Sequence, residues 1–122
     1  MSDNIRYYIN EIESINKKLY PISSFEIIGS NIKWNRIVKT KLVPLINDIN
    51  SDLTVAEKVY SKLLDSINPL SRKNAASNCL KLNIYVEKSI EVLEYISNNE
   101  QNANIAFSAD MVLKIYRGEM PD

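Results

Sequence analysis

Apolar side chains recur every three to four residues along most of this chain, which is the spacing of one face of an α-helix. Five segments show this period, and no segment shows the strict alternation of apolar and polar residues that marks a half-buried strand. The sequence therefore predicts an all-α fold, a compact bundle of four to five mostly antiparallel helices with short connections. The length fits one domain, residues 1–122. The predicted helices span residues 3–20, 30–50, 54–68, 71–97 and 105–117.

Proline and glycine mark several of the expected helix boundaries. Pro21 is expected to end the first helix, and the apolar connector that follows, residues 21–29, is expected to lie across the bundle. Pro44 falls inside the second predicted helix, but the apolar stripe keeps its phase across it, so we expect a kink there rather than a break. Gly118 suits the left-handed position after the last helix.

The third predicted helix has a local start signal of its own. Thr54 and Glu57 have the spacing of a capping box, in which each side chain binds a free amide of the other's residue. The helix is then expected to run to Pro69. Its predicted buried stripe consists of Val55, Val59, Leu63 and Ile67.

The fourth predicted helix, residues 71–97, is the longest and is expected to lie at the centre of the bundle. It is apolar on two sides, so it is either covered on both or exposes an interface. The connector at residues 21–29 or the last helix could supply the cover. The second strip with its acidic margin consists of Leu80, Ile84, Tyr95, Glu87 and Glu91.

Tyr7 also lies outside the main stripe of its helix and is expected to be exposed. Tyrosine is enriched at the energetic centres of protein interfaces. The candidate protein-binding residues are therefore Leu80, Ile84, Glu87, Glu91, Tyr95 and Tyr7.

Residue types that act as acid–base catalysts or nucleophiles at neutral pH are scarce in this sequence. The chain has no histidine and a single cysteine, Cys79, which lies on a core stripe and is expected to be a buried apolar residue. Two glycines are too few for a phosphate-binding loop, and the cluster Glu87, Glu91 and Glu94 lacks the histidines of a helical dimetal site. We expect no catalytic residue, no cofactor and no metal.

Charge and hydropathy narrow the range of partners. Fifteen basic residues balance fifteen acidic ones, which argues against nucleic acid or an anionic membrane as a partner but leaves a local basic face open. A helix-turn-helix with Arg72, Lys73 and Asn74 at the start of its second helix is the weaker alternative. No apolar run is long enough to span a membrane, no signal peptide is evident, and a lone cysteine fits the reducing cytoplasm of the cell or of a host.

These observations predict a small non-enzymatic protein-binding module, such as an inhibitor, an immunity-type protein, an adaptor or an assembly subunit. Its partner would be another protein or a second copy of the chain in a homodimer. The alternatives are a small nucleic-acid-binding regulator with a local basic face and a helical small-ligand binder. The abundance of asparagine and isoleucine indicates an AT-rich genome, such as that of a phage or mobile element.

Overall fold

The computed structural model describes residues 3–22 and 28–119, and all the regular elements in this part of the chain are helices. The all-α prediction is confirmed. Because α2, η1 and α3 form one continuous rod, the described chain folds as six helices, one more than the upper predicted count. The elements are α1 (Asp3–Ile22), α2 (Ile28–Ile37), the π-helical segment η1 (Val38–Leu42), α3 (Val43–Asn50), α4 (Leu53–Leu63), α5 (Pro69–Leu82), α6 (Val86–Asn99) and α7 (Ala103–Tyr116).

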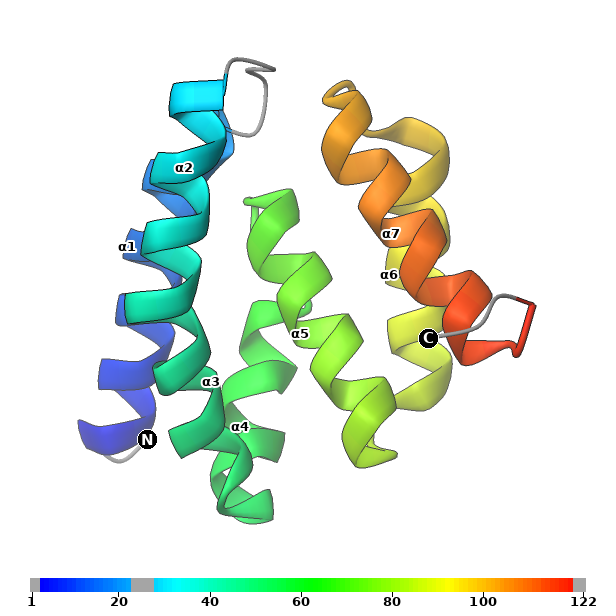
Figure 1. Cartoon of the computed structure of the whole chain (residues 1–122). Coiled ribbons are helices and arrows are strands. Elements are labelled where there is room, and N and C mark those ends of the chain that lie inside the picture. The colour runs from blue at the N-terminus through cyan, green and yellow to red at the C-terminus, as the bar shows by residue number, and fades with distance from the viewer. Residues whose placement is uncertain (1–2, 23–27, 120–122) are drawn as a thin grey trace.

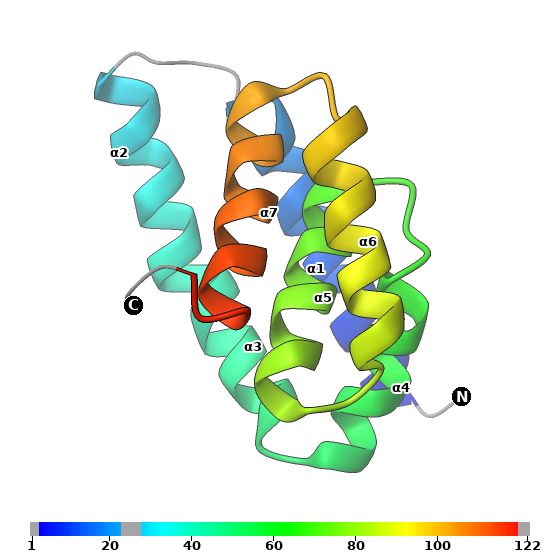
Figure 2. The same ribbon diagram turned by 90° about the vertical axis from the view of Figure 1, so that its right-hand side faces the viewer.

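The helices are arranged in three layers around α5 (Figure 1). One layer holds α1 and the α2–η1–α3 rod, the middle layer holds α4 and α5, and the third is the hairpin of α6 and α7. Consecutive helices alternate in direction, as Figure 2 shows for α5, α6 and α7. Since α5 packs against α1, α4, α6 and α7, it is the central element of the fold.

The core is formed by the apolar faces of these helices, as the helical period predicts. Cys79 is fully buried, and burial raises the pKa of its thiol to about 11. Trp34 is partly buried and packs against the edge of the core. The largest fully buried apolar side chains are Tyr60, Ile12, Leu19, Ile49, Leu63, Leu70, Leu93 and Ile96.

The α2–η1–α3 rod continues past Pro44 through a widened turn. Pro44 has no amide hydrogen, so the carbonyl of Thr40 loses its usual helical donor. The amide of Val43 instead donates to the carbonyl of Val38, five residues earlier, and the Thr40 hydroxyl donates to the carbonyl of Arg36 at 2.6 Å. The expectation that the helix carries on past Pro44 is confirmed, with a π-helical segment just before it.

Helix α1 also extends further than predicted, because Pro21 lies inside its last turn and the helix ends at Ile22. A proline this close to the end of a helix removes one internal hydrogen bond and leaves the rest of the helix in place. The following rod begins at Ile28, two residues earlier than expected. Most of the predicted connector, residues 23–27, lies outside the described residues.

The capping-box prediction at Thr54 is wrong. Asp52 is the N-cap residue of α4, with extended backbone angles, and its Oδ1 accepts from the amides of Thr54 and Val55 at 3.0 and 3.4 Å. Thr54 therefore already lies inside the first turn of the helix. Asp52 and Thr54 can both serve as an N-cap, and the helix uses Asp52, which is nearer to α3.

We expect Asp52→Ala to lower the free energy of unfolding by about 1 kcal/mol, because the mutation leaves two amides of the first turn without their acceptor. Thr54→Ala, two residues on, is the matched control and should leave stability within error. Urea denaturation of both variants measures the difference. A larger loss for Thr54→Ala would place the start of α4 at Thr54.

Helix α4 ends at Leu63, five residues before the predicted end. Pro69 occupies the first turn of α5 rather than stopping α4, and the Asn68 side chain caps α5 by accepting from the Leu70 amide at 2.8 Å. Ile67, predicted to be buried, lies in the connection and is 95% exposed. Proline suits a helix start because its missing donor would have been free there anyway.

The prediction of one long helix over residues 71–97 is also wrong, because the chain turns back between α5 and α6. Asn83 adopts a left-handed conformation with φ of +58°, and the amide of Ile84 donates to the carbonyl of Cys79 at 2.9 Å, which closes the end of α5. Tyr85 is left-handed too, with φ of +46°. The three-to-four-residue spacing of apolar residues continues through this turn. The sequence pattern therefore does not reveal that two antiparallel helices are present.

One side of α5 is polar and is buried against neighbouring helices. Asn16 of α1 is fully buried, and its Nδ2 donates to Ser71 Oγ at 3.0 Å and to Asn74 Oδ1 at 2.9 Å. One turn further along α5, Asn78 Nδ2 donates to the carbonyl of Asn74 at 2.8 Å.

The same line of hydrogen bonds continues to α3 and α4. Asn78 Oδ1 accepts from Asn50 Nδ2 at 2.9 Å, and Asn50 Oδ1 accepts from the Tyr60 hydroxyl. We call this set the polar ladder, and it ties α5 to α1, α3 and α4. Its members are Asn16, Ser71, Asn74, Asn78, Asn50 and Tyr60.

Candidate functional site

The predicted binding residues do not form one strip, because the helix on which they were placed is divided into two. Leu80 on α5 is 8% exposed, and Ile84 in the turn packs against the core. Tyr95 on α6 is 62% exposed, and Glu87 and Glu91 on the same helix are exposed as well. Tyr7 is 57% exposed on α1, as expected. The role of these residues in binding stays a prediction.

Glu91 and Tyr95 line a groove of about 440 Å³ between α6 and the connection from α4 to α5. Three of its four charged side chains, Asp65, Lys88 and Arg72, already have partners within the chain, and the fourth is Glu91. Lys88 pairs with Asp65 at 3.3 Å, and the Arg72 guanidinium donates to the Ser66 carbonyl at 2.7 Å. This groove therefore offers few unsatisfied groups to a ligand.

Three of the exposed large apolar side chains lie on α7, a helix whose start is fixed by Asn102. The Asn102 side chain caps the helix by accepting from the amides of residues 104 and 105 at 3.0 and 3.3 Å. One side of the helix is buried through Ile105, Ala109 and Leu113. The opposite side is apolar too, and we call it the α7 face. It consists of Phe107, Met111 and Ile115.

The α7 face is exposed along three turns of the helix. Phe107 is 64% exposed and Ile115 40%, with Met111 partly buried between them. Two charged residues occur within α7, Asp110 and Lys114, and their side chains pair with each other at 3.0 Å. The face is therefore apolar and carries no unpaired charge of its own helix.

A groove of about 290 Å³ borders the α7 face where α7 meets α5. Ile115 and Tyr116 line it from α7, and Leu80 and Lys81 line it from α5. Leu80 is thus the predicted binding residue that the fold brings to this surface. Phe107, Met111 and Ile115 were missed as candidates, although their spacing of four residues, on a helix whose other side is apolar, could have identified them.

The residues proposed for base contacts in a helix-turn-helix form hydrogen bonds within the protein instead. Lys73 Nζ donates to Ser108 Oγ of α7 at 2.8 Å, and burial lowers the pKa of this ammonium group. Arg72 binds the Ser66 carbonyl, and Asn74 belongs to the polar ladder. Because α5 is covered by helices on several sides, it does not have the exposure of a recognition helix.

The Tyr60 phenol and the Cys79 thiol are held in their less reactive, protonated forms. Burial raises the pKa of the Tyr60 phenol as well as that of the Cys79 thiol, so both stay protonated at neutral pH. A hydrogen bond to Glu100, at 2.8 Å, is the main cause of the raised pKa of Tyr20. Within residues 3–22 and 28–119, no three acidic or thiol side chains are grouped as metal ligands would be.

Comparison with known protein families, curated proteins and solved structures gives no match. In the part of the chain that the structure describes, no helix has the length and apolar character needed to cross a membrane. Function must therefore be argued from the surfaces of this chain itself.

Proposed function

We propose that this protein is a non-enzymatic binding module that docks a partner protein on the α7 face. The observation that supports the proposal is the row of Phe107, Met111 and Ile115, spaced four residues apart on the exposed side of α7. An amphipathic helix of a partner recognises a surface of this kind through its own residues at the same spacing.

The composition of the α7 face fits the centre of a protein interface. Such centres are enriched in aromatic residues and methionine and depleted of charge. Burying one large apolar side chain contributes about 1.5–3 kcal/mol, so the exposed residues of the face could together drive association. The Arg117–Glu94 ion pair, at 3.1 Å, lies at the end of the helix and would belong to the polar rim.

The proposal can be tested with a photo-crosslinking amino acid placed at Ile115. In expressing cells we expect one discrete adduct from this position, and we expect Phe107→Glu to abolish it, since a carboxylate would have to be buried in the interface. Mass spectrometry of the adduct identifies the partner. An adduct of twice the chain mass shows that the partner is a second copy.

Ile67 supplies the matched control, because it is the most exposed of the large apolar residues described and lies apart from α7. The variant Ile67→Glu should leave the adduct unchanged. Both variants should keep the melting temperature of the parent protein, since both side chains are largely exposed. The proposal fails if Ile115 gives no adduct, or if Ile67→Glu removes the adduct as completely as Phe107→Glu.

A further inference from the structure

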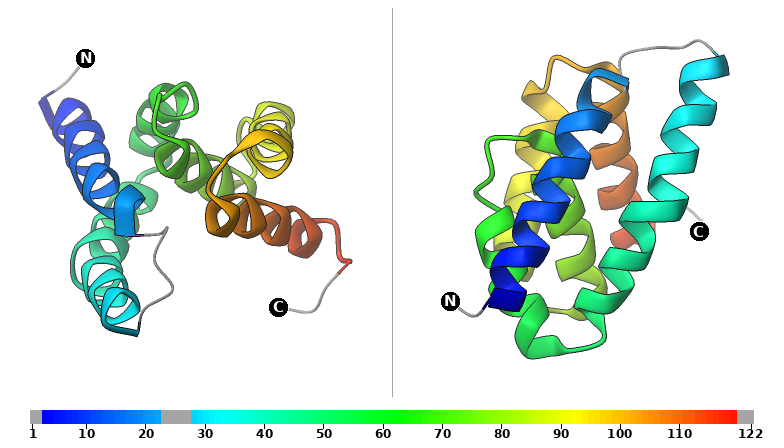
Figure 3. Two further views of the ribbon diagram at one scale, coloured as in Figure 1. Left: turned by 90° about the horizontal axis from the view of Figure 1, so that it is seen from above. Right: turned by 90° about the vertical axis from the view of Figure 1, so that its left-hand side faces the viewer.

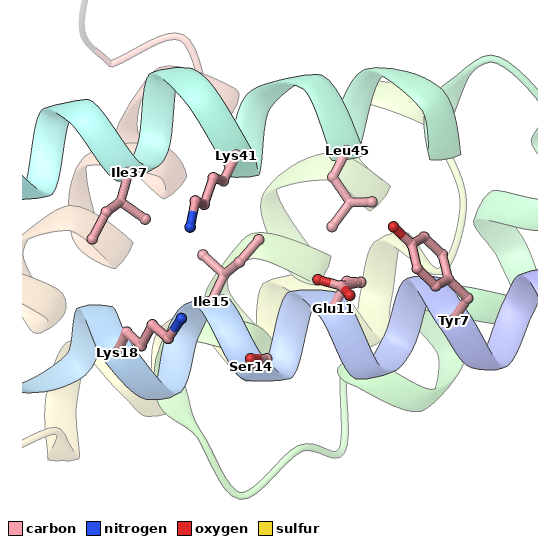
Figure 4. A pocket seen from close by; sticks show the side chains of 8 residues that line it. All are labelled: Tyr7, Glu11, Ser14, Ile15, Lys18, Ile37, Lys41 and Leu45. Atoms are coloured by element: carbon pink, nitrogen blue, oxygen red, sulfur yellow. The ribbon is translucent and has the colours of Figure 1, made fainter.

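A groove of about 320 Å³ runs between α1 and the α2–η1–α3 rod (Figure 4). Its apolar lining comes from Ile15, Ile37 and Leu45. The ammonium groups of Lys18 and Lys41 point into it from opposite walls near one end, as Figure 4 shows. Its polar lining consists of Tyr7, Glu11, Ser14, Lys18 and Lys41.

The two lysines of this groove are not neutralised by neighbouring carboxylates. Among residues 3–22 and 28–119, the ion pairs are Lys88 with Asp65, Lys114 with Asp110 and Arg117 with Glu94, all of them away from α1 and the rod. Glu11 is the one carboxylate that lines the groove, and it stands toward the opposite end, beside Tyr7 (Figure 4). The groove is therefore positive at one end and has an acceptor and an aromatic ring at the other.

The positive charge continues along the rod beyond the groove. Residues 28–47 contain Lys33, Arg36, Lys39 and Lys41 and no acidic residue, and all four side chains are exposed. Lys33 precedes Ile37 by four residues, as Ile37 precedes Lys41, so it lies on the groove side of the rod. The net charge of zero hides this basic segment, because the acidic residues that balance it lie elsewhere in the sequence.

The π-helical segment η1 sets the position of Lys41. π-helical turns are rare and occur frequently at functional sites. Here Pro44 removes the donor for the Thr40 carbonyl, and the widened turn that results contains Lys41. The same local feature that disturbs the helix thus brings an ammonium group to the groove.

We infer that this groove binds single-stranded nucleic acid. Lys18 and Lys41 hold a phosphate, Lys33 further along the rod follows the next one, and a base lies against Tyr7 and the apolar lining. Sites for single strands combine a positive groove that follows the backbone with aromatic side chains that stack on bases. Glu11 repels phosphate and accepts from the exocyclic amino group of a cytosine, which orients the nucleotide.

A single strand fits these observations better than a small anion or a duplex. The basic residues extend along the rod for about two turns, from Lys33 to Lys41, further than one phosphate group needs. A groove of about 320 Å³ admits one flat base but not a double helix. The groove lies on the side of the molecule formed by α1 and the rod, with α6 and α7 behind it in Figure 3. The α7 face is therefore a separate surface, and Phe107→Glu should not alter this binding.

The test uses the whole protein and a fluorescein-labelled oligodeoxycytidine of about 12 nucleotides, a length within the site sizes of single-strand binders. Fluorescence anisotropy measures the affinity between about 50 and 200 mM salt. Each phosphate contact on a single strand contributes about 0.7 to the slope of log affinity against log salt. We expect Lys18→Gln combined with Lys41→Gln to weaken binding at least about tenfold at low salt and to reduce that slope by about 1.4.

Lys58→Gln combined with Lys62→Gln is the matched control. These two lysines are exposed on α4, they make the same change in net charge, and their substitution should leave the affinity unchanged. Lys18→Arg combined with Lys41→Arg keeps both charges and should retain binding, which separates loss of charge from loss of structure. Melting curves of all three double variants should match the parent.

Three kinds of result would overturn the inference. The first is no measurable binding at low salt, or equal losses in the groove variant and the α4 control. The second is displacement of the oligonucleotide by cytidine monophosphate at comparable concentration, which would show a small-ligand site. The third is equally tight binding of a duplex of the same length, which would show general attraction to a polyanion.

Discussion

Leu63→Ala is expected to lower the free energy of unfolding by about 2–5 kcal/mol. The same truncation four residues further on, Ile67→Ala, is expected to change it by less than about 0.5 kcal/mol. Leu63 is 1% exposed in the core, where its removal leaves a cavity, whereas Ile67 is 95% exposed in the connection between α4 and α5. Urea denaturation with a shared slope measures both values.

This pair of variants distinguishes the observed end of α4 at Leu63 from the later end that the sequence pattern predicts. Both residues belong to the same apolar stripe, so a helix continued to Ile67 would bury them together. Similar losses for the two variants would show that α4 extends past Leu63 in solution. A loss below about 1 kcal/mol for Leu63→Ala would show that the site is not part of a packed core.

The second large effect is expected in the polar ladder. Asn78→Ala should lower the free energy of unfolding by about 1–3 kcal/mol, because it leaves Asn50 Nδ2 without its acceptor and removes the side-chain bond to the Asn74 carbonyl in a largely buried setting. Thermal and urea denaturation both measure the loss.

Asn99→Ala is a close control for this change. Asn99 Nδ2 donates to the carbonyl of Tyr95, four residues earlier, just as Asn78 donates to that of Asn74. Asn99 is exposed and lacks the second bond to another helix, so alanine there should be neutral or slightly stabilising through its higher helix propensity. Equal effects of the two substitutions would mean that the bond between Asn78 and Asn50 adds nothing to stability.

The sequence pattern predicted the helical class and the buried sides of the helices, because both follow from the spacing of apolar residues. Ile5, Ile12 and Leu19, which follow one another at an interval of two helical turns, are buried, and Gly118 is left-handed with φ of +74° after α7, as expected. Boundaries were less predictable where two local signals compete. Asp52 and Thr54 are both good caps, and the choice between them depends on how α3 and α4 pack.

The turn at residues 83–85 could not be recognised from spacing, because the apolar period continues across it. Asparagine at position 83 tolerates the left-handed conformation, but asparagine occurs throughout this chain and so does not single out the turn. Tyr85 is left-handed although nothing in its side chain favours that conformation. It is the N-cap residue of α6, and its carbonyl accepts from the Ser89 amide at 2.9 Å.

The candidate surfaces were predictable only in part. Tyr7 and Leu80 lie in the two grooves on which the proposals rest, but the groove at Lys18 and Lys41 needs two helices brought together by the fold. The net charge of a chain is a sum over all its residues and does not show where the basic residues lie. The basic segment of the rod was therefore hidden by a net charge of zero.

The three-layer arrangement places two natural reporters in different parts of the molecule. Trp34, the single tryptophan, lies on the rod, and Cys79, the single cysteine, lies on α5 where it faces Ser89 of α6. Indole fluorescence thus follows release of the rod, whereas reaction of the buried thiol with a disulfide reagent follows separation of the C-terminal hairpin. Coincidence of such signals is the standard test of all-or-none unfolding. The unmodified chain can therefore reveal whether its two outer layers detach together or one at a time.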